Sequence, residues 1–237
     1  MLNQLTPQEM ACRVKIRALI FDMDGLLFDT ERISIPAWQE AGQEFGYTIP
    51  TSLVLKTIGM DKRATREVHL NYFGKDYPFD EINLIKKERL KQYIEKYGLP
   101  RKEGVSEILQ LVKELRLKSA LATSSSRQMT NYLLTKANLN DFFDVVICGD
   151  EVTRVKPDPE IFLKAATYLG VLTEECLVLE DSPNGIRAAW EAGMLAVLVP
   201  DLREIPPEVE RLAFQKMTSL VEVTHWLKAK LKNEEIL

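Results

Sequence analysis

The chain has 237 residues, of which 46% are hydrophobic and 28% charged, with a net charge of −4 and a pI near 5.5. This composition is typical of a globular protein with one large domain carrying an insertion, or with two domains. The acidic balance argues against a nucleic-acid-binding surface, and the three widely spaced cysteines predict neither a disulfide framework nor a zinc site. No apolar run is long enough to span a membrane, and no signal peptide pattern is present, so we expect a cytoplasmic protein without membrane association.

The first predicted element is a buried strand over Ile16–Phe21, an apolar run that Gly25 follows with a turn. Asp22 and Asp24 therefore emerge at the carboxyl end of a strand, where open α/β sheets bind ligands. Alternate strand residues point to opposite faces, so the chain must leave strand geometry near Asp24 if both carboxylates are to meet one substrate. Two like charges this close favour a shared proton or a divalent cation.

Nearly one hundred residues separate Asp24 from Thr123, far more than one crossover between parallel strands requires. Apolar residues in this interval recur at three- and four-residue spacing, which indicates helices, and no strong strand pattern is present. We therefore predict an inserted helical domain over residues 28–97, with the α/β core formed by residues 1–27 and 98–237. The linkers are expected near Asp29–Thr30 and in Gly98–Pro100.

The rest of the chain alternates short apolar runs with helical patterns. The predicted strands cover residues 118–123, 144–148, 176–180 and 194–199, and the predicted helices cover residues 105–115, 127–137, 159–169 and 184–192. This alternation predicts right-handed crossovers and a Rossmann-like α/β fold, a parallel sheet with helices on both faces.

Polar side chains follow the carboxyl ends of four predicted strands. They are Asp22 with Asp24, Thr123 with Ser124 and Ser125, Lys156, and Glu180 with Asp181. Because the strand ends of a parallel sheet converge on one crevice, we expect these groups to be neighbours. Four clustered carboxylates need compensation, and oxygen ligands suit Mg²⁺. The sequence thus predicts a magnesium site made by Asp22, Asp24, Glu180 and Asp181.

A carboxylate nucleophile beside Mg²⁺, a lysine and a hydroxyl has the parts needed for phosphoryl transfer through an aspartyl-phosphate. In this hypothesis Asp22 attacks phosphorus, and Mg²⁺ with Lys156 neutralises the phosphoryl oxygens. Thr123 donates a hydrogen bond to the same oxygens. Asp24 protonates the leaving alkoxide and then accepts a proton from the hydrolytic water.

The segment Asp-Met-Asp-Gly-Leu-Leu-Phe-Asp-Thr from Asp22, the strand-borne Thr123, the Lys156-Pro-Asp-Pro loop and the Glu180-Asp181-Ser182-Pro-Asn-Gly segment together resemble the haloacid dehalogenase-like hydrolase superfamily. The similarity runs from about Ile16 to Val199. It is closest to the branch that contains beta-phosphoglucomutase, phosphoglycolate phosphatase and sugar-phosphate phosphatases. The inserted helical domain resembles the small helical cap of that branch.

The resemblance implies Asp22 as nucleophile, Asp24 as acid and base, Thr123 and Lys156 as phosphate binders, and Asp22 with Asp181 on the metal. It also implies that Asp24 contacts the metal through its backbone carbonyl. The further substrate contacts predicted by this comparison are Ser124, Ser125 and Asn184 in the core, and Lys62 and Arg63 in the cap loop 58–63.

Several alternatives stay open at this stage. Dehalogenases of this fold use neither a metal nor a leaving-group acid, so Asp24 and Glu180–Asp181 favour phosphate chemistry. The phosphomutase pattern places a histidine where this chain has Glu31–Ser34, so a phosphatase is favoured over a mutase. A phospho-accepting signalling domain would need no cap. We expect a phosphatase of a small phosphate monoester, such as a sugar phosphate, that acts as a monomer or weak dimer.

Two other features have simpler interpretations. The basic cluster Lys86, Lys87, Arg89 and Lys91 is interleaved with glutamates at helical spacing, which is typical of a solvated helix face. His69 stands between two apolar residues and is expected to pack within the protein or on its surface rather than bind a ligand.

Overall fold

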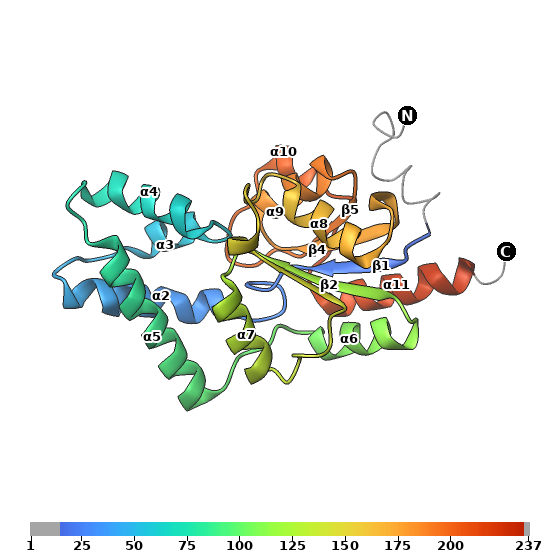
Figure 1. Cartoon of the computed structure of the whole chain (residues 1–237), viewed down its shortest axis with the longest axis horizontal. Coiled ribbons are helices and arrows are strands. Elements are labelled where there is room, and N and C mark those ends of the chain that lie inside the picture. The colour runs from blue at the N-terminus through green and yellow to red at the C-terminus, as the bar shows by residue number, and fades with distance from the viewer. Residues whose placement is uncertain (1–14, 235–237) are drawn as a thin grey trace.

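The structure is a computed structural model that describes residues 15–234. Six parallel strands form one sheet in the order β3-β2-β1-β4-β5-β6 (Figure 1). They are β1 (Ala18–Phe21), β2 (Lys118–Thr123), β3 (Val145–Cys148), β4 (Cys176–Glu180), β5 (Leu195–Leu198) and β6 (Gln215–Lys216). The strand that precedes Asp22 therefore lies inside the sheet, with β2 on one side and β4 on the other.

Helices cover both faces of the sheet, as the alternation of strands and helices predicts. One face packs against α6 (Val105–Glu114), α7 (Arg127–Lys136) and α11 (Leu220–Glu234). The other packs against α8 (Glu160–Leu169), α9 (Pro183–Glu191) and α10 (Pro207–Glu210). In Figure 1 the pair α6 and α11 lies below the sheet and the pair α8 and α9 above it. The α/β fold with helices on both faces is thus confirmed.

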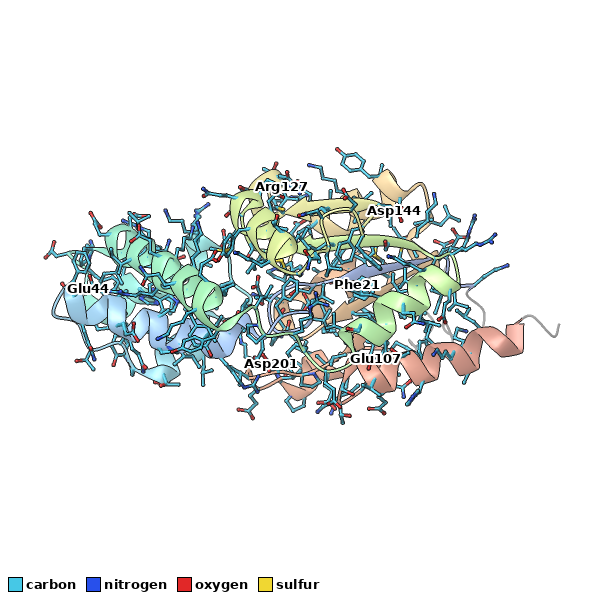
Figure 2. The ribbon with its side chains drawn as sticks, turned by 90° about the horizontal axis from the view of Figure 1, so that it is seen from below. Phe21, Glu44, Glu107, Arg127, Asp144 and Asp201 are labelled. Carbon is cyan, nitrogen blue, oxygen red and sulfur yellow. The ribbon has the colours of Figure 1, made fainter. Side chains whose placement is uncertain are left out.

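Strand β1 shows why this segment is buried on both sides. Its residues Leu19 and Phe21 pack into the first core, whereas Ala18 and Ile20 pack into the second, and all four are 0% exposed. Successive side chains of a strand point to opposite faces, so a strand covered on both faces needs a continuous apolar run. Figure 2 labels Phe21 in the middle of the sheet domain. The apolar run therefore places Asp22 at the carboxyl end of β1, directly after the last buried strand residue.

Four helices between β1 and β2 form a separate lobe, which we call the cap (Figure 1). They are α2 (Thr30–Glu44), α3 (Thr51–Thr57), α4 (Lys62–Phe73) and α5 (Phe79–Tyr97). The cap has its own apolar cluster, which includes Trp38, Leu53, Phe79 and Ile82. Figure 2 labels Glu44 at the end of the cap that is far from the sheet.

The two connections between cap and sheet run side by side. The backbone N–H of Asp29 donates to the carbonyl of Pro100 at 2.9 Å, and that of Lys102 donates to the carbonyl of Leu27 at 3.0 Å. Because both crossings are hydrogen-bonded to each other, any movement of the cap must bend both together. That the hinge lies at the linkers expected near Asp29–Thr30 and Gly98–Pro100 stays a prediction.

Asp201, in the loop after β5, ties both connections to the core. One oxygen, Oδ1, accepts from Arg32 at 2.9 Å and from Lys102 at 2.7 Å. Arg32 belongs to the first turn of α2 and also donates to Asp29 at 2.7 Å. The Asp201 side chain is 1% exposed, and its other oxygen, Oδ2, has no hydrogen-bond partner. Figure 2 labels Asp201 near the junction of cap and sheet domain.

The predicted element boundaries lie within two residues of those in the structure, and about half of them coincide with it. The first strand begins at Ala18 rather than Ile16, and the helix expected over residues 184–192 covers Pro183–Glu191. The elements beyond Val199, namely α10, β6 and α11, were not predicted. None of the helices described is long and apolar enough to cross a membrane.

Candidate active site

A cavity of about 690 Å³ lies between the cap and the carboxyl ends of the strands. Its sheet side is lined by Asp22, Asp24, Thr123, Lys156 and Asp181, and its cap side by residues of α2, α3, α4 and α5. Strands β1, β2 and β4 thus bring together residues separated by more than 150 positions in the chain. A cavity of this size can enclose a small organic ligand.

A buried lysine connects the ends of all three strands. Lys156 Nζ donates to Asp22 Oδ1 and to Glu180 Oε1, each at 2.6 Å, and to the carbonyl of Ala122 at 3.0 Å. The ammonium group also lies 4.9 Å from the centre of the Phe162 ring. Lys156 is 4% exposed, and its three donors are fully used, so its position beside Asp22 is fixed.

Burial disfavours the charged form of Lys156 and of the carboxyl groups near it. For Lys156 the ion pairs have the larger effect on the pKa. Burial alone favours the neutral amine, but the charges of Asp22 and Glu180 outweigh it and raise the pKa of Lys156. Burial raises the pKa of the Asp22 carboxyl, and Lys156 offsets only part of that increase. Burial, with the charges of Glu180 and Asp22, raises the pKa of Asp181 well above its usual value. The carboxylates here exceed the positive charge available to them.

Asp22, Glu180 and Asp181 each offer a carboxylate oxygen, and the three oxygens lie within 4.8 Å of one another. Within residues 15–234 no hydrogen bond reaches the Asp181 side chain, which lines the cavity. Two glycines allow this close packing of carboxylates. A Cβ at Gly25, which has φ +85°, would lie 2.3 Å from Asp181 Oδ2, and one at Gly185 would lie 1.8 Å from Glu180 Oε1. Three hard oxygen donors and one open face fit a divalent cation.

The second aspartate of the predicted motif is held differently. Asp24 Oδ1 accepts from Thr30 Oγ1 at 2.6 Å, and Asp24 Oδ2 accepts from Ser125 Oγ at 2.7 Å. Thr30 opens the first cap helix and Ser125 follows β2, so Asp24 bridges the two lobes. Its side chain is not part of the three-carboxylate cluster. Asp22 and Asp24 thus lie in two different environments. Asp22 is buried and ion-paired, whereas Asp24 is hydrogen-bonded at the boundary between the two lobes.

The hydroxyl cluster after β2 faces the cavity. Thr123 is 1% exposed, and its Oγ1 accepts from the backbone N–H of Ser125 at 3.1 Å. Thr123, Ser124 and Ser125 all line the cavity. A threonine hydroxyl that accepts a backbone hydrogen bond keeps its own proton free to donate to a ligand.

The structure does not bring every predicted site residue to the same place. Glu180 is 0% exposed and lies beneath the cavity wall, tied to Lys156 and to the N–H of Ser182 at 2.8 Å. Asn184, in the first turn of α9, is not among the residues that line the cavity. Lys62 lines the cavity but pairs with Asp80 at 2.5 Å, whereas Arg63 lines it and has no ion pair with any described residue.

Several residues that line the cavity were not predicted from the sequence, and they include two ionisable residues of the cap. Glu31 and Lys86 line the cap side, from α2 and α5. Glu31, Ser34 and Trp38 are spaced by three and four residues, which places Glu31 on the face of α2 that carries the buried Trp38. This spacing could have indicated from the sequence that Glu31 lies on the same face of the helix as Trp38. The interpretation of the Lys86 cluster as a solvated helix face is wrong for Lys86 and Lys87, because α5 turns them into the cavity.

Comparison with known proteins supports these observations. Residues 19–199 match the haloacid dehalogenase-like hydrolase family. The phosphorylated carbohydrates phosphatase of Thermotoga maritima is 34% identical over 180 residues, which cover 76% of this chain and 82% of that protein. Hexitol phosphatase B of Escherichia coli is 31% identical over 222 residues, 89% of this chain and 95% of that protein.

A solved structure extends the similarity to three dimensions. CbbY of Rhodobacter sphaeroides, determined in complex with xylulose-(1,5)bisphosphate, superposes with a TM-score of 0.74 at 26% identity and covers 87% of this chain and 96% of that one. The predicted enzyme class, a phosphatase of this hydrolase type with a helical cap, is confirmed. The chain belongs to the haloacid dehalogenase-like hydrolase family.

Proposed function

We propose that this hydrolase is a Mg²⁺-dependent phosphatase that cleaves a small phosphate monoester, of a sugar or a similar polyol, through an aspartyl-phosphate intermediate. The observation that carries the proposal is the Asp22 carboxylate, which lines the cavity at the end of β1 and is held by Lys156 at 2.6 Å. The relatives named as phosphatases of phosphorylated carbohydrates and of hexitols support the substrate class.

The donor set suits Mg²⁺, which prefers few carboxylates and keeps several waters. Asp22 and Asp181 would hold the ion from the cavity side, together with the backbone carbonyl of Asp24, and Glu180 would support it from beneath. When bound, the ion would neutralise negative charge on the transferring phosphoryl group. The three-carboxylate cluster and the raised pKa of Asp181 favour this assignment.

The first chemical step would be attack of an Asp22 oxygen on phosphorus. The new Asp22–phosphorus bond forms as the bond from phosphorus to the ester oxygen breaks, and the electron pair leaves with that oxygen. Asp24 would give its proton to the departing alkoxide. Lys156 holds Asp22 in place and supplies a positive charge, and Thr123 and Ser124 would donate hydrogen bonds to the phosphoryl oxygens. Ser125, expected from the sequence to contact the substrate, instead gives its hydroxyl proton to Asp24.

The second step would release phosphate. Asp24 accepts a proton from water, the water oxygen bonds to phosphorus, and the bond from phosphorus to Asp22 breaks, which restores the free carboxylate. The hydrogen bonds from Thr30 and Ser125 hold the Asp24 side chain in place at the cavity. The cap, which closes the cavity opposite Asp22, would keep bulk water from the ester before the first step.

A phosphomutase is the second candidate. Such an enzyme returns the phosphoryl group to its intermediate rather than to water. The mutase pattern has a histidine within the stretch Glu31–Ser34, and this chain has none there, although Ser34 lines the cavity. This difference favours hydrolysis. A phospho-accepting signalling domain is no longer a candidate, because the chain belongs to the hydrolase family.

The test is a phosphate-release assay over a panel of phosphorylated sugars and polyols, with and without Mg²⁺. We expect turnover with Mg²⁺, none after EDTA, and recovery when Mg²⁺ is added back. Full activity in chelator would contradict the metal assignment, and conversion of a sugar 1-phosphate into its 6-phosphate without phosphate release would favour the mutase. Sedimentation of the same sample tests the proposed monomer or weak dimer.

A further inference from the structure

The cavity is much larger than a phosphate group, so its cap side must meet the rest of the substrate. The phosphate-binding groups proposed above lie on the sheet side, and the helices α2 and α5, which pack against each other, form much of the opposite wall. Glu31 and Lys86 project into the cavity from these two helices. Within residues 15–234, Glu31 has no hydrogen bond or ion pair, and the same is true of Lys86 and of its neighbour Lys87, which also lines the cavity.

Glu31 is half-buried in the first turn of α2, and no hydrogen bond reaches its carboxyl group from residues 15–234. Burial, and after it the charge of Asp24, raises the pKa of Glu31 to about 8. A protonated carboxyl group can donate one hydrogen bond and accept another, which matches a hydroxyl group. A buried polar group that lacks partners in the free protein is costly unless a ligand supplies them.

Lys86 is held in place without being neutralised. Its ammonium lies 5.6 Å from the centre of the Trp38 ring, a cation–π contact from α5 to α2. Its pKa is lowered first by burial, while the charges of Glu31 and Asp24 oppose the decrease. Lys86 and Glu31 therefore interact electrostatically without forming an ion pair, and both side chains line the cavity, where a polar ligand atom can reach them.

The neighbours of Glu31 decide what kind of ligand atom that is. The charges that act on it include those of Asp24, Asp201 and Asp22, with only Lys86 opposing them. This surplus of carboxylates disfavours a second phosphate or carboxylate near Glu31 and favours an uncharged hydroxylated carbon. Because Asp24 is the group that would protonate the ester oxygen, Glu31 lies beside the leaving group rather than at its far end.

We propose that Glu31 and Lys86 form a hydroxyl-recognition subsite that selects phosphate esters of polyols by the hydroxyl on the carbon next to the ester carbon. The inference rests on the proposed phosphatase function and adds to it the feature of the leaving group that is read. It assigns specificity to the walls α2 and α5, in addition to the cap loop 58–63. In that loop Lys62 is already paired with Asp80, and the Lys62 side chain is 61% exposed.

The experiment compares two esters that differ by one hydroxyl, glycerol 1-phosphate and 3-hydroxypropyl phosphate, with Mg²⁺ present. The ratio of their kcat/KM values measures recognition of the hydroxyl and cancels any effect on chemistry common to both. In the unmodified enzyme we expect a ratio of about 10 or more. Glu31→Ala and Lys86→Met should each bring the ratio close to one, and Glu31→Gln, which keeps one donor and one acceptor, should restore part of it.

Two matched control substitutions lie on α5, the helix that carries Lys86. Lys96→Met removes a lysine of α5 that also rests over a ring, that of Tyr97 at 4.9 Å, but does not line the cavity. Glu81→Ala removes an exposed carboxylate from the first turn of α5. Both controls should leave the ratio unchanged. Binding of the two esters to Asp22→Asn by calorimetry, with and without Glu31→Ala, gives the same comparison without turnover.

The outcomes separate the two proposals. If the unmodified enzyme hydrolyses both esters with equal efficiency, the hydroxyl is not recognised and the subsite is overturned. If Glu31→Ala slows the hydrolysis of both esters by the same factor, Glu31 acts on Asp24 alone and the subsite is again overturned. If the unmodified enzyme releases phosphate from neither of these esters nor from p-nitrophenyl phosphate, the phosphatase function itself is overturned.

Discussion

His69 in the cap and Lys156 in the sheet domain are 0% and 4% exposed, and both can carry a charge. His69 packs among the rings of Trp38 and Phe79, with centroids 4.7 Å and 5.4 Å away. Its Nδ1 lies 3.2 Å from Tyr77 Oη, and its Nε2 has no hydrogen-bond partner among residues 15–234. Lys156 instead has two carboxylates and a carbonyl as partners.

The two environments drive these groups in opposite directions. Burial lowers the pKa of His69 to about 4, so the cap keeps a neutral ring that serves as core. The sheet edge keeps a charged ammonium, and that charge is offset by Glu180 and by Asp22, which also lines the cavity. Burial of an ionisable side chain is thus not a functional signal by itself. The signal is burial together with opposite charge and access to a ligand.

Removing the nucleophile should give the largest effect on the sheet-edge side of this comparison. Asp22→Asn is nearly isosteric and keeps the fold, but it removes the covalent route, so we expect kcat to fall by well over ~10³-fold. Asp141→Asn, a change of one exposed carboxylate in the same domain, is the control and should be silent. Turnover near that of the unmodified enzyme in Asp22→Asn would mean that another residue is the nucleophile.

Asp24 should behave differently from Asp22, because it is hydrogen-bonded at the lobe boundary rather than ion-paired. Asp24→Asn keeps the backbone carbonyl and loses the proton transfer, so alkyl phosphate hydrolysis should fall by ~10²–10⁴-fold. Steady-state and burst kinetics should show a smaller loss in the first step for an aryl phosphate, whose leaving group needs no acid. Equal losses for both esters, with phosphorylation rate-limiting, would refute the leaving-group role.

The cap side of the comparison predicts a pH effect on stability. The unfolded chain takes up a proton at His69 below pH 6.5, whereas the folded chain does so only near pH 4. The free energy of unfolding should therefore fall as the pH drops from 6.5 to 4, by roughly 3 kcal/mol from this residue. Urea titrations of the unmodified protein and of His69→Gln should show different slopes over that range.

His225→Gln is the matched control for this measurement, since His225 is the other histidine of the chain and is exposed. It should keep the slope of the unmodified protein. Identical slopes in all three proteins would show that the pKa of His69 is the same in the folded and the unfolded chain, and the contrast between cap and sheet edge would disappear.

The smallest effect is expected from a single methyl group beside the carboxylate cluster. Gly25→Ala would place a Cβ 2.3 Å from Asp181 Oδ2, so Asp181 must shift, and the affinity for Mg²⁺ measured by calorimetry should weaken by ~10–100-fold. Gly46→Ala shares the positive φ, at +78°, but meets nothing within 4 Å, so it reports backbone strain alone. Equal affinities in the two variants would remove Asp181 from the cation site.

The sequence predicted the site residues at the sheet edge but not those in the cap. Asp22, Thr123, Lys156 and Asp181 could be placed together because each follows a short apolar strand, and parallel strand ends converge. Glu31 and Lys86 could not be placed in that way. Their position depends on how α2 packs against α5 and on how the cap faces the sheet. A local sequence pattern predicts neither of these arrangements.

The C-terminal part shows a second limit. Asp201 lies in a loop whose contacts are with Arg32 and Lys102, far away in the chain, and β6 is only two residues long. Short strands and long-range ion pairs leave little periodicity for a pattern to detect. The His69 packing, in contrast, was expected from its apolar neighbours and is confirmed.

The place of β1 inside the sheet also has a consequence for the order in which the chain can fold. Phe21 pairs with Leu121 on one side and with Leu179 on the other, so the first strand to leave the ribosome waits for partners made much later. The cap helices contact one another, chiefly α2 against α5, within a stretch of chain that is complete by Tyr97. Because contacts between residues close in the chain form faster than distant ones, we expect the cap to become compact first, while the β4 side of β1 stays unpaired and exposed to other nascent chains until β4 has been synthesised.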